Sequence, residues 1–258
     1  MTTVLDDDTQ PLDPLSVPAT PVLDVRDVHK IYDDGVQQVR AVDGVDLLVE
    51  RGEYVAIMGA SGSGKSTMMN ILGCLDVPTS GEYYLDGIDV ASLGERQLSR
   101  VRNQDIGFVF QAFNLIPSMT ARANVELPML YAGVPAAERR ERARAALEVV
   151  GLDQRANHRP NALSGGQQQR VAVARSLVNA PALILADEPT GNLDTRSTHE
   201  VLDIFDQLNG LGRTIVLITH EDEVAERARR VVRMRDGKIV SDARNAPRAA
   251  AHLAGGAR

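Results

Sequence analysis

The chain has 258 residues and a net charge of −7, with 43% hydrophobic and 24% charged residues. This length allows one large or two small domains with a buried core, and the acidic balance argues against a dominant nucleic-acid-binding surface, so we expect no nucleic-acid partner. The single cysteine excludes an internal disulfide. No run of about 18 apolar residues occurs, so the sequence predicts no transmembrane helix.

The two ends of the chain differ in composition from its middle. Residues 1–21 are acidic and rich in proline and threonine, and they lack the basic start and apolar core of a signal peptide. We expect this segment to be a disordered leader. Residues 244–258 are biased towards alanine, arginine and glycine, and we expect a tail without an assigned function. The folded domain is therefore expected over residues 22–243.

The first part of this domain has the pattern of β-strands. Apolar and polar residues alternate over 22–28 and 39–50, which predicts half-buried strands. The nearly continuous apolar run at 54–59 favours a strand covered on both faces, as in a parallel sheet. A helical pattern follows from Lys65, and residues 82–87 form a further predicted strand after a Pro-Thr-Ser-Gly turn.

The middle of the chain has helical patterns from about residue 115 to 177, and strand-like runs return at 182–187 and 214–220. The clearest helix begins at Pro135 and ends at Gly151. Strands that alternate with helices predict an α/β fold with a parallel-sheet core. The middle helices are then an α-helical subdomain inserted into that core.

Residues 59–66, GASGSGKS, form the strongest single motif of the chain. They follow an apolar strand and begin a helix, which is the context that a phosphate-binding P-loop requires. The glycines let backbone N–H groups converge on phosphate oxygens, and the helix N-terminus adds partial positive charge. Lys65 adds a point charge, and the Ser66 hydroxyl can bind Mg²⁺. The alternative is a glycine-serine turn with a surface lysine, which the flanking strand and helix disfavour.

Polar side chains end two of the later apolar runs. Asp187 and Glu188 follow one run and His220 ends the next. Ligands bind at the carboxyl ends of parallel strands, so Asp187 is placed to hold Mg²⁺ through water. Glu188, one residue further, is placed to act as a general base on the attacking water. His220 is predicted to contact the terminal phosphate. Without the P-loop, a solvated strand end and a structural histidine would be the better interpretations.

The segment LSGGQQQR, residues 163–170, predicts a second anion site. The Ser164 side chain can cap a helix, and Gly165 and Gly166 leave the next backbone N–H groups uncovered. One phosphate cradle already exists at 59–66. Two copies of the chain could therefore share two nucleotides, each copy presenting its serine and glycines to the phosphate held by the other.

Between Tyr32 and Asp242 the chain resembles the ATP-binding subunit of an ABC transporter. The motifs that carry this resemblance occur in the family's order: GASGSGKS, GFVFQ, LSGGQ, LILADE, GNLD and the histidine after TIVLIT. The sequences FNLIP and NVELPM resemble those of the branch that contains MacB-like, LolD-like and FtsE-like proteins. They are closest to the MacB-like type. The resemblance implies a P-loop NTPase of ABC type, with an N-terminal antiparallel β subdomain beside the parallel core and the helical insertion.

The resemblance also implies an active ATPase that uses ATP and Mg²⁺, with Glu188 as the catalytic base and His220 as the switch histidine. Tyr32 would stack on adenine, although a tyrosine packed in a turn is the alternative from spacing alone. The implied Mg²⁺ ligands are Ser66, Gln111 and, through water, Asp187. The implied phosphate-binding residues are Gly59, Ala60, Ser61, Gly62, Ser63, Gly64, Lys65, Ser66 and Thr67.

The implied partners are a second copy of the chain and separate transmembrane permease subunits, at the cytoplasmic face of the membrane. Asp194 would reach across the dimer interface, and the residues implied to contact the partner's ATP are Ser164, Gly165, Gly166 and Gln167. An apolar patch after Gln111 is predicted to receive a short helix of the membrane subunit, with a core between subdomains as the alternative: Phe113, Leu115, Ile116, Pro117 and Met119.

The same residues disfavour two rival functions. A soluble ABC ATPase of translation or DNA repair usually carries two ATPase domains or a long coiled coil, and neither pattern occurs in this chain. A P-loop kinase or GTPase does not account for LSGGQ or for His220. The sequence therefore favours the ATPase subunit of a membrane transporter, with export or extraction as its direction.

Overall fold

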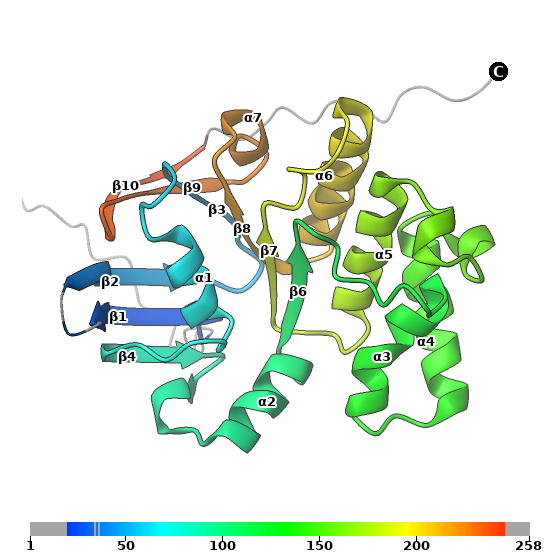
Figure 1. Cartoon of the computed structure of the whole chain (residues 1–258), viewed down its shortest axis with the longest axis horizontal. Helices are drawn as coiled ribbons and strands as arrows, with labels where there is room; N and C mark the ends of the chain where they lie inside the picture. The colour runs from blue at the N-terminus through cyan, green and yellow to red at the C-terminus, as the bar shows by residue number, and fades with distance from the viewer. Residues whose placement is uncertain (1–19, 34, 36, 246–258) are drawn as a thin grey trace, which may run out of the picture.

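A computed structural model describes residues 20–33, 35 and 37–245 (Figure 1). Nearly all of the predicted leader (1–21) and tail (244–258) lie outside these residues. The strands are β1 (Leu23–Asp33), β2 (Gln38–Val49), β3 (Tyr54–Met58), β4 (Ser80–Leu85), β5 (Ile88–Asp89), β6 (Ile106–Phe110), β7 (Leu183–Asp187), β8 (Thr214–Thr219), β9 (Arg230–Arg235) and β10 (Lys238–Arg244).

The described helices alternate with these strands. The α-helices are α1 (Lys65–Leu72), α2 (Glu95–Gln104), α3 (Ala121–Tyr131), α4 (Ala136–Val149), α5 (Gly165–Leu177), α6 (Thr195–Gly210) and α7 (Asp222–Ala225). Short 3₁₀ turns are η1 (Val90–Ser92), η2 (Asp153–Arg155) and η3 (Pro160–Ala162). None of these described helices combines the length and apolarity that a membrane span requires.

The central sheet has the strand order β10-β9-β3-β8-β7-β6, and all neighbouring pairs except β10 and β9 are parallel. The strands β3, β7 and β8 were expected from their apolar runs, whereas β6, β9 and β10 extend the sheet beyond the sequence prediction. All five residues of β3 are buried. A strand buried on both faces has no polar side to alternate with, which explains its continuous apolar run.

Two hydrophobic cores lie on opposite faces of this sheet. Tyr54, Ala56 and Met58 of β3 belong to the core that helices α3 to α6 cover. Val55 and Ile57 point to the other face and pack with α1 and the smaller sheet. Because side chains of a strand alternate between faces, one short strand contributes to both cores. Figure 1 shows the same layers, with the central sheet between α1 and the helices α5 and α6.

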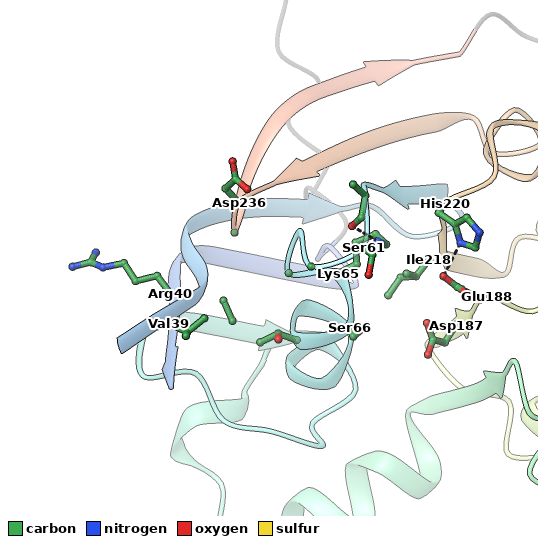
Figure 2. A pocket seen from close by; sticks show the side chains of 16 residues that line it. Val39, Arg40, Ser61, Lys65, Ser66, Asp187, Glu188, Ile218, His220 and Asp236 are labelled. Carbon is green, nitrogen blue, oxygen red and sulfur yellow. Dashed lines mark hydrogen bonds and ion pairs between the residues drawn. The ribbon is translucent and has the colours of Figure 1, made fainter. Parts of the chain in front are cut away.

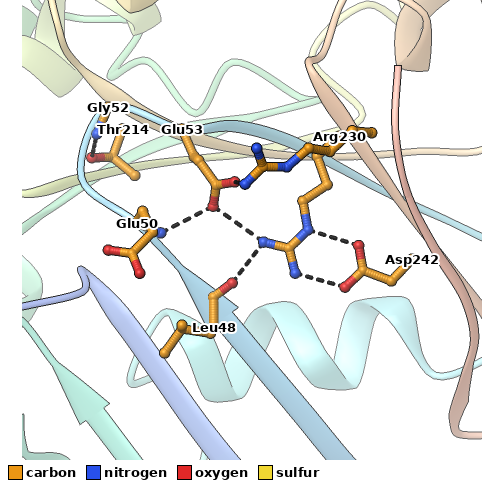
Figure 3. Close-up of polar contacts among 8 residues, drawn as sticks. Leu48, Glu50, Gly52, Glu53, Thr214, Arg230 and Asp242 are labelled. Atoms are coloured by element: carbon orange, nitrogen blue, oxygen red, sulfur yellow. Dashed lines mark hydrogen bonds and ion pairs between the residues drawn. The ribbon is translucent and has the colours of Figure 1, made fainter. Parts of the chain in front are cut away.

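The smaller sheet has the order β2-β1-β4-β5 and is antiparallel, as expected for the N-terminal subdomain. A polar cluster centred on Arg230 of β9 joins it to the central sheet (Figure 3). The guanidinium donates to both carboxylate oxygens of Asp242 at 2.7 and 2.6 Å. It also donates to the Leu48 carbonyl at 2.8 Å and to Glu53 at 3.1 Å. One side chain thus fixes the end of β2 against β9 and β10.

The helices α3, α4 and α5 pack together at one end of the molecule (Figure 1). Helix α4 begins directly after Pro135 and is followed by Gly151, which has a positive φ of 68°. This confirms the predicted helix between those two residues. The helical group contacts the sheet through α5, which lies against β6. A side chain on Gly107 of β6 would collide with the α5 backbone, since its Cβ would lie 2.4 Å from the Ser176 carbonyl oxygen.

Candidate nucleotide-binding site

A pocket of about 770 Å³ opens beside the N-terminus of α1 (Figure 2). Its walls come from β2, from the loop before α1, from the ends of β7 and β8, and from the turn between β9 and β10. The predicted phosphate-binding residues that line it are Ala60, Ser61, Gly62, Gly64, Lys65, Ser66 and Thr67. Gly59 and Ser63 belong to the same loop but do not line the pocket.

The loop is held in a conformation that glycine alone tolerates at one position. Gly64 has a φ of 99°, and a Cβ there would lie 2.2 Å from the Ala41 carbonyl oxygen. Close contact with β2 and a left-handed backbone therefore both exclude a side chain. No side chain of the described residues caps α1, so its first N–H groups stay available to an anion. Lys65 is only 7% exposed and donates to the Gly59 and Ala60 carbonyls at 2.7 and 2.9 Å.

Asp187, Glu188 and His220 meet at the opposite wall of the pocket (Figure 2). Glu188 has a φ of 41°, which turns the chain sharply after β7, and its amide donates to the Ile218 carbonyl of β8 at 2.9 Å. Its carboxylate lies 2.8 Å from His220 Nδ1. Burial raises the pKa of Asp187, the neighbouring Glu188 charge raises it further, and Lys65 opposes both effects.

Tyr32 and Gln111 do not line this pocket. The Tyr32 hydroxyl donates to Asp76 at 2.9 Å, and the Lys30 ammonium lies 5.1 Å from the tyrosine ring centroid. The ring is nevertheless 44% exposed, so one side of it stays accessible. Gln111 directly follows β6, and its carbonyl accepts a hydrogen bond from Asn192 at 3.0 Å.

The segment LSGGQ forms the N-terminus of α5, outside the nucleotide pocket. Ser164 caps the helix as predicted, because its hydroxyl accepts from the Gln167 amide at 3.3 Å and Gln167 Oε1 accepts from the Ser164 amide at 3.0 Å. Gly166 is buried, and its Cβ would lie 2.5 Å from Ser197 Oγ. From the sequence, this glycine is interpreted only as a residue that leaves backbone N–H groups uncovered. The sequence does not indicate that Gly166 also packs closely against α6.

Asp194 caps α6, the helix that Gly166 contacts. Its carboxylate accepts from the Ser197 amide at 2.8 Å and from the Ser197 hydroxyl at 3.2 Å. These hydrogen bonds, first of all the one from the backbone amide, lower the pKa of Asp194. The structure thus places Asp194 and the start of LSGGQ at two neighbouring helix N-termini.

The predicted coupling patch is half-buried except for Pro117, which is exposed. Leu115 packs against the core under the helices. Asn124 holds the backbone of the next residue, Ile116. Its Oδ1 accepts from the Ile116 amide at 2.7 Å, and its Nδ2 donates to the Ile116 carbonyl at 3.2 Å. A separate pocket of about 250 Å³ lies beside the patch, between α2, α3 and β6. The apolar side chains in its lining include Phe108, Phe110, Leu127 and Tyr131.

The sequence did not predict the pocket wall formed by Val39, Arg40 and Ala41 of β2 and by the turn at Asp236 and Gly237. An Asp-Gly pair predicts a tight turn, and both residues have positive φ as such a turn requires. The pair carries no information about where the turn lies in three dimensions. Only the three-dimensional structure therefore identifies these residues as part of the pocket wall.

A sequence profile of the ABC transporter family matches residues 42–191. An uncharacterised ABC transporter ATP-binding protein of Thermotoga maritima is 56% identical over 218 residues, which cover 84% of this chain and 93% of that protein. The chain belongs to the ABC transporter family. The macrolide export ATP-binding/permease protein MacB of Hyphomonas neptunium is 53% identical over 230 residues, or 89% of this chain and 36% of MacB.

Solved structures give the same result. A dimeric ATP-binding cassette in a post-hydrolysis state, bound to ADP and Pi, superposes with a TM-score of 0.79 at 45% identity. The match covers 86% of this chain and 98% of that structure. The predicted ABC-type fold and the predicted ATPase activity are thereby confirmed, and the rival functions in translation or DNA repair gain no support. The chain is an ATP-binding, ATP-hydrolysing cassette.

Proposed function

We propose that this cassette acts as a homodimer that drives separate permease subunits at the cytoplasmic face of a membrane. The observation that supports it most is the convergence of Lys65, Asp187, Glu188 and His220 on one pocket, with Glu188 bonded to His220. A buried cation would suffice to bind phosphate. An acid pair and a histidine opposite that cation suit cleavage of the terminal phosphate.

ATP would place its phosphates in the loop from Gly59 to Thr67. The N–H groups at the start of α1 would donate to the charge that develops on the γ-phosphoryl group. The Lys65 ammonium uses two of its three donors on the Gly59 and Ala60 carbonyls and would offer the third to a phosphate. Tyr32 would stack on adenine with its exposed face. Its hydroxyl bond to Asp76 fixes the edge of the ring, which limits the entropy lost when a base stacks on it.

The residues near the loop fit a Mg²⁺ ion. The described residues contain no group of three or more histidine, cysteine, aspartate or glutamate side chains that could hold a metal. Mg²⁺ does not need one, since it keeps several waters and takes further oxygens from phosphates. Ser66 would supply an oxygen ligand and Asp187 would act through a water, and both line the pocket. Gln111, which does not line it in this structure, would complete the set when nucleotide binds. The ion, when bound, neutralises charge on the phosphates.

Glu188 would accept the proton of the attacking water. With a proton on Nδ1, His220 donates to the Glu188 carboxylate and holds it in one orientation. A second proton, on Nε2, would let the ring also donate to a phosphate oxygen. The sharp backbone turn at Glu188 directs the carboxylate away from the strand that Asp187 ends. The two adjacent acids can therefore have different roles, one towards the metal and one towards water.

The second copy would supply the N-terminus of α5. Ser164 is exposed, and its 3.3 Å bond to the Gln167 amide is long, so the hydroxyl can turn to a phosphate of the partner's ATP at little cost. Gly165, Gly166 and Gln167 would contribute backbone and amide groups. Asp194, at the adjacent helix, would contact the facing subunit. Dimeric structures of a related cassette support a dimer of this chain.

The permease partner is proposed from the relatives and from the patch after Gln111. MacB combines an ATP-binding and a permease part under one name, and this chain matches 36% of its length. In the proposed complex, a membrane subunit supplies the permease function. Its short helix would contact the patch of Phe113, Leu115, Ile116, Pro117 and Met119 and the neighbouring 250 Å³ pocket.

The variant Glu188→Gln tests the proposal. We expect ATP binding to persist and hydrolysis to fall by about a hundredfold or more, because the amide cannot accept the proton of water. The variant should accumulate as a dimer with MgATP, measured by light scattering after gel filtration. Glu138→Gln is the control, since Glu138 pairs with Arg142 on the exposed surface of α4 and does not line the pocket. Near-normal hydrolysis by Glu188→Gln would exclude Glu188 as the base.

The same variant identifies the partner. Extracted from membranes with MgATP, it should co-purify with a protein that has transmembrane helices. Ribosomal or DNA-bound proteins in place of a membrane protein would favour the soluble alternative over the transporter.

A further inference from the structure

Gln169 is a buried polar side chain for which the mechanism above has no role. It lies on α5, five residues after Ser164, and has no exposed surface. The start of the helix faces outward, towards the proposed partner, while Gln169 points inward to the sheet. Burying an amide costs free energy unless the amide makes hydrogen bonds, so its partners need an explanation.

The amide of Gln169 joins the ends of two adjacent strands. Its Nε2 donates to the Pro189 carbonyl at 2.6 Å and to the Phe110 carbonyl at 3.3 Å. Pro189 directly follows Glu188, and Phe110 directly precedes Gln111. The strands β6 and β7 are parallel neighbours, with Phe110 in register with Asp187. One NH₂ group therefore bridges the chain segments that carry the proposed base and the proposed metal ligand.

The contacts use the amide only as a donor. Both partners are carbonyl oxygens, which fixes the orientation of the NH₂ group, and Oε1 has no hydrogen-bond partner among the residues that the structure describes. An apolar side chain of the same length would fill this space without an unpaired oxygen. What the amide adds is a bridge of defined geometry between two loops.

We propose that Gln169 is a positioning residue for ATP hydrolysis. It holds Gln111 and Glu188 at a fixed separation and ties both to the helix whose first turn faces the partner's nucleotide. A second bond supports the same bridge, since Asn192, which lies between Glu188 and Asp194 in the chain, donates to the Gln111 carbonyl at 3.0 Å. The inference rests on the roles proposed above for Gln111, Glu188 and α5.

The test is Gln169→Met in the full-length protein. Methionine keeps the length and volume of the side chain but removes both donors. We expect kcat to fall on the order of tenfold to a hundredfold, because small displacements of catalytic groups are costly, while KM for ATP stays within about twofold. Gln169→Glu, whose buried neutral carboxyl retains one donor, should give an intermediate kcat and tests the same point if the methionine variant does not fold.

Asn209→Leu is the matched control. Asn209 is 6% exposed, and its amide also bridges two backbone carbonyls, those of Gly52 and Arg213 at 2.8 and 3.0 Å. These lie before β3 and β8, at the end of the sheet away from the pocket. We expect a lower urea midpoint with wild-type kcat for this variant. Equal kcat for wild type and Gln169→Met, or equal loss of kcat in both variants, would overturn the role of Gln169. Full hydrolysis by Glu188→Gln would instead overturn the proposed function.

Discussion

The helices α1 and α5 both begin beside glycines, and their N-termini differ in what surrounds them. The start of α1 lies in a pocket with a buried lysine and two carboxylates, and no described side chain caps it. The start of α5 is capped by Ser164 and Gln167 and lines no part of that pocket. A site for phosphate is thus nearly complete at α1 within one copy, whereas the donors at the start of α5 lie outside that pocket. The difference supports the proposal that α5 acts on a nucleotide held by another copy.

The largest expected effects come from variants at the N-termini of α1 and α5, which should differ in whether they change ATP affinity as well as the rate of hydrolysis. Lys65→Ala should weaken ATP binding and reduce hydrolysis by about a hundredfold or more, since a buried cation is lost from the phosphate site. Ser164→Arg should reduce hydrolysis by a similar factor but leave the ATP affinity of the monomer unchanged, because its site belongs to the partner. Calorimetric titration and steady-state hydrolysis measure the two quantities. Weaker monomer binding in Ser164→Arg would place α5 in the same copy's site.

A smaller effect is expected within the glycine pair of α5. Gly166→Ala should destabilise the fold by about 1–3 kcal/mol, because its Cβ would lie 2.7 Å from Ser197 Cβ. Gly165→Ala is the matched control, since its Cβ would meet no atom closer than 3.6 Å. Urea denaturation measures both, and the double variant Gly166→Ala with Ser197→Gly should recover part of the loss. Equal stability of the two single variants would remove the packing explanation for Gly166.

The smallest effect concerns Asp187. Its pKa is raised above the ordinary 3.8, mainly by burial, so the folded protein carries this charge at a cost. That cost is absent below the unfolded pKa and appears as pH rises through the folded pKa. Without nucleotide or Mg²⁺, Asp187→Asn should therefore be more stable than wild type at pH 7, by less than about 1 kcal/mol. The gap should close as pH falls towards 4, followed by urea denaturation. A stability difference between Asp187→Asn and wild type that does not change with pH would contradict the raised pKa of Asp187.

Local patterns in the sequence were enough to predict the strands and helices around the P-loop. The strands β3, β7 and β8 are visible in the sequence as continuous apolar runs, because a strand that is buried on both faces has no polar side. The helix between Pro135 and Gly151 is visible because the residues that start and end a helix lie next to it in the chain. The same holds for the loop before α1, whose function requires a strand, glycines and a helix in succession. Asp187, Glu188 and His220 could be placed on the pocket because parallel strands end at one edge of a sheet.

Contacts between distant segments could not be predicted from such patterns. Arg40 and the Asp236–Gly237 turn line the pocket only because the two sheets lie against each other. The burial of Gly166 depends on α6, which is about 30 residues away in the chain. Gln169 had no signal at all, since a glutamine in a run of glutamines gives no indication of which one points into the core. These residues need the three-dimensional fold for their interpretation.

Mixing two inactive variants tests most directly whether α5 completes the site of a second copy. A heterodimer of Lys65→Ala and Ser164→Arg has one intact composite site, built from the P-loop of the serine variant and the α5 terminus of the lysine variant. We predict that hydrolysis in the mixture rises above that of either variant alone and falls when one of them is omitted. Activity equal to the average of the two variants at every ratio would contradict the shared site.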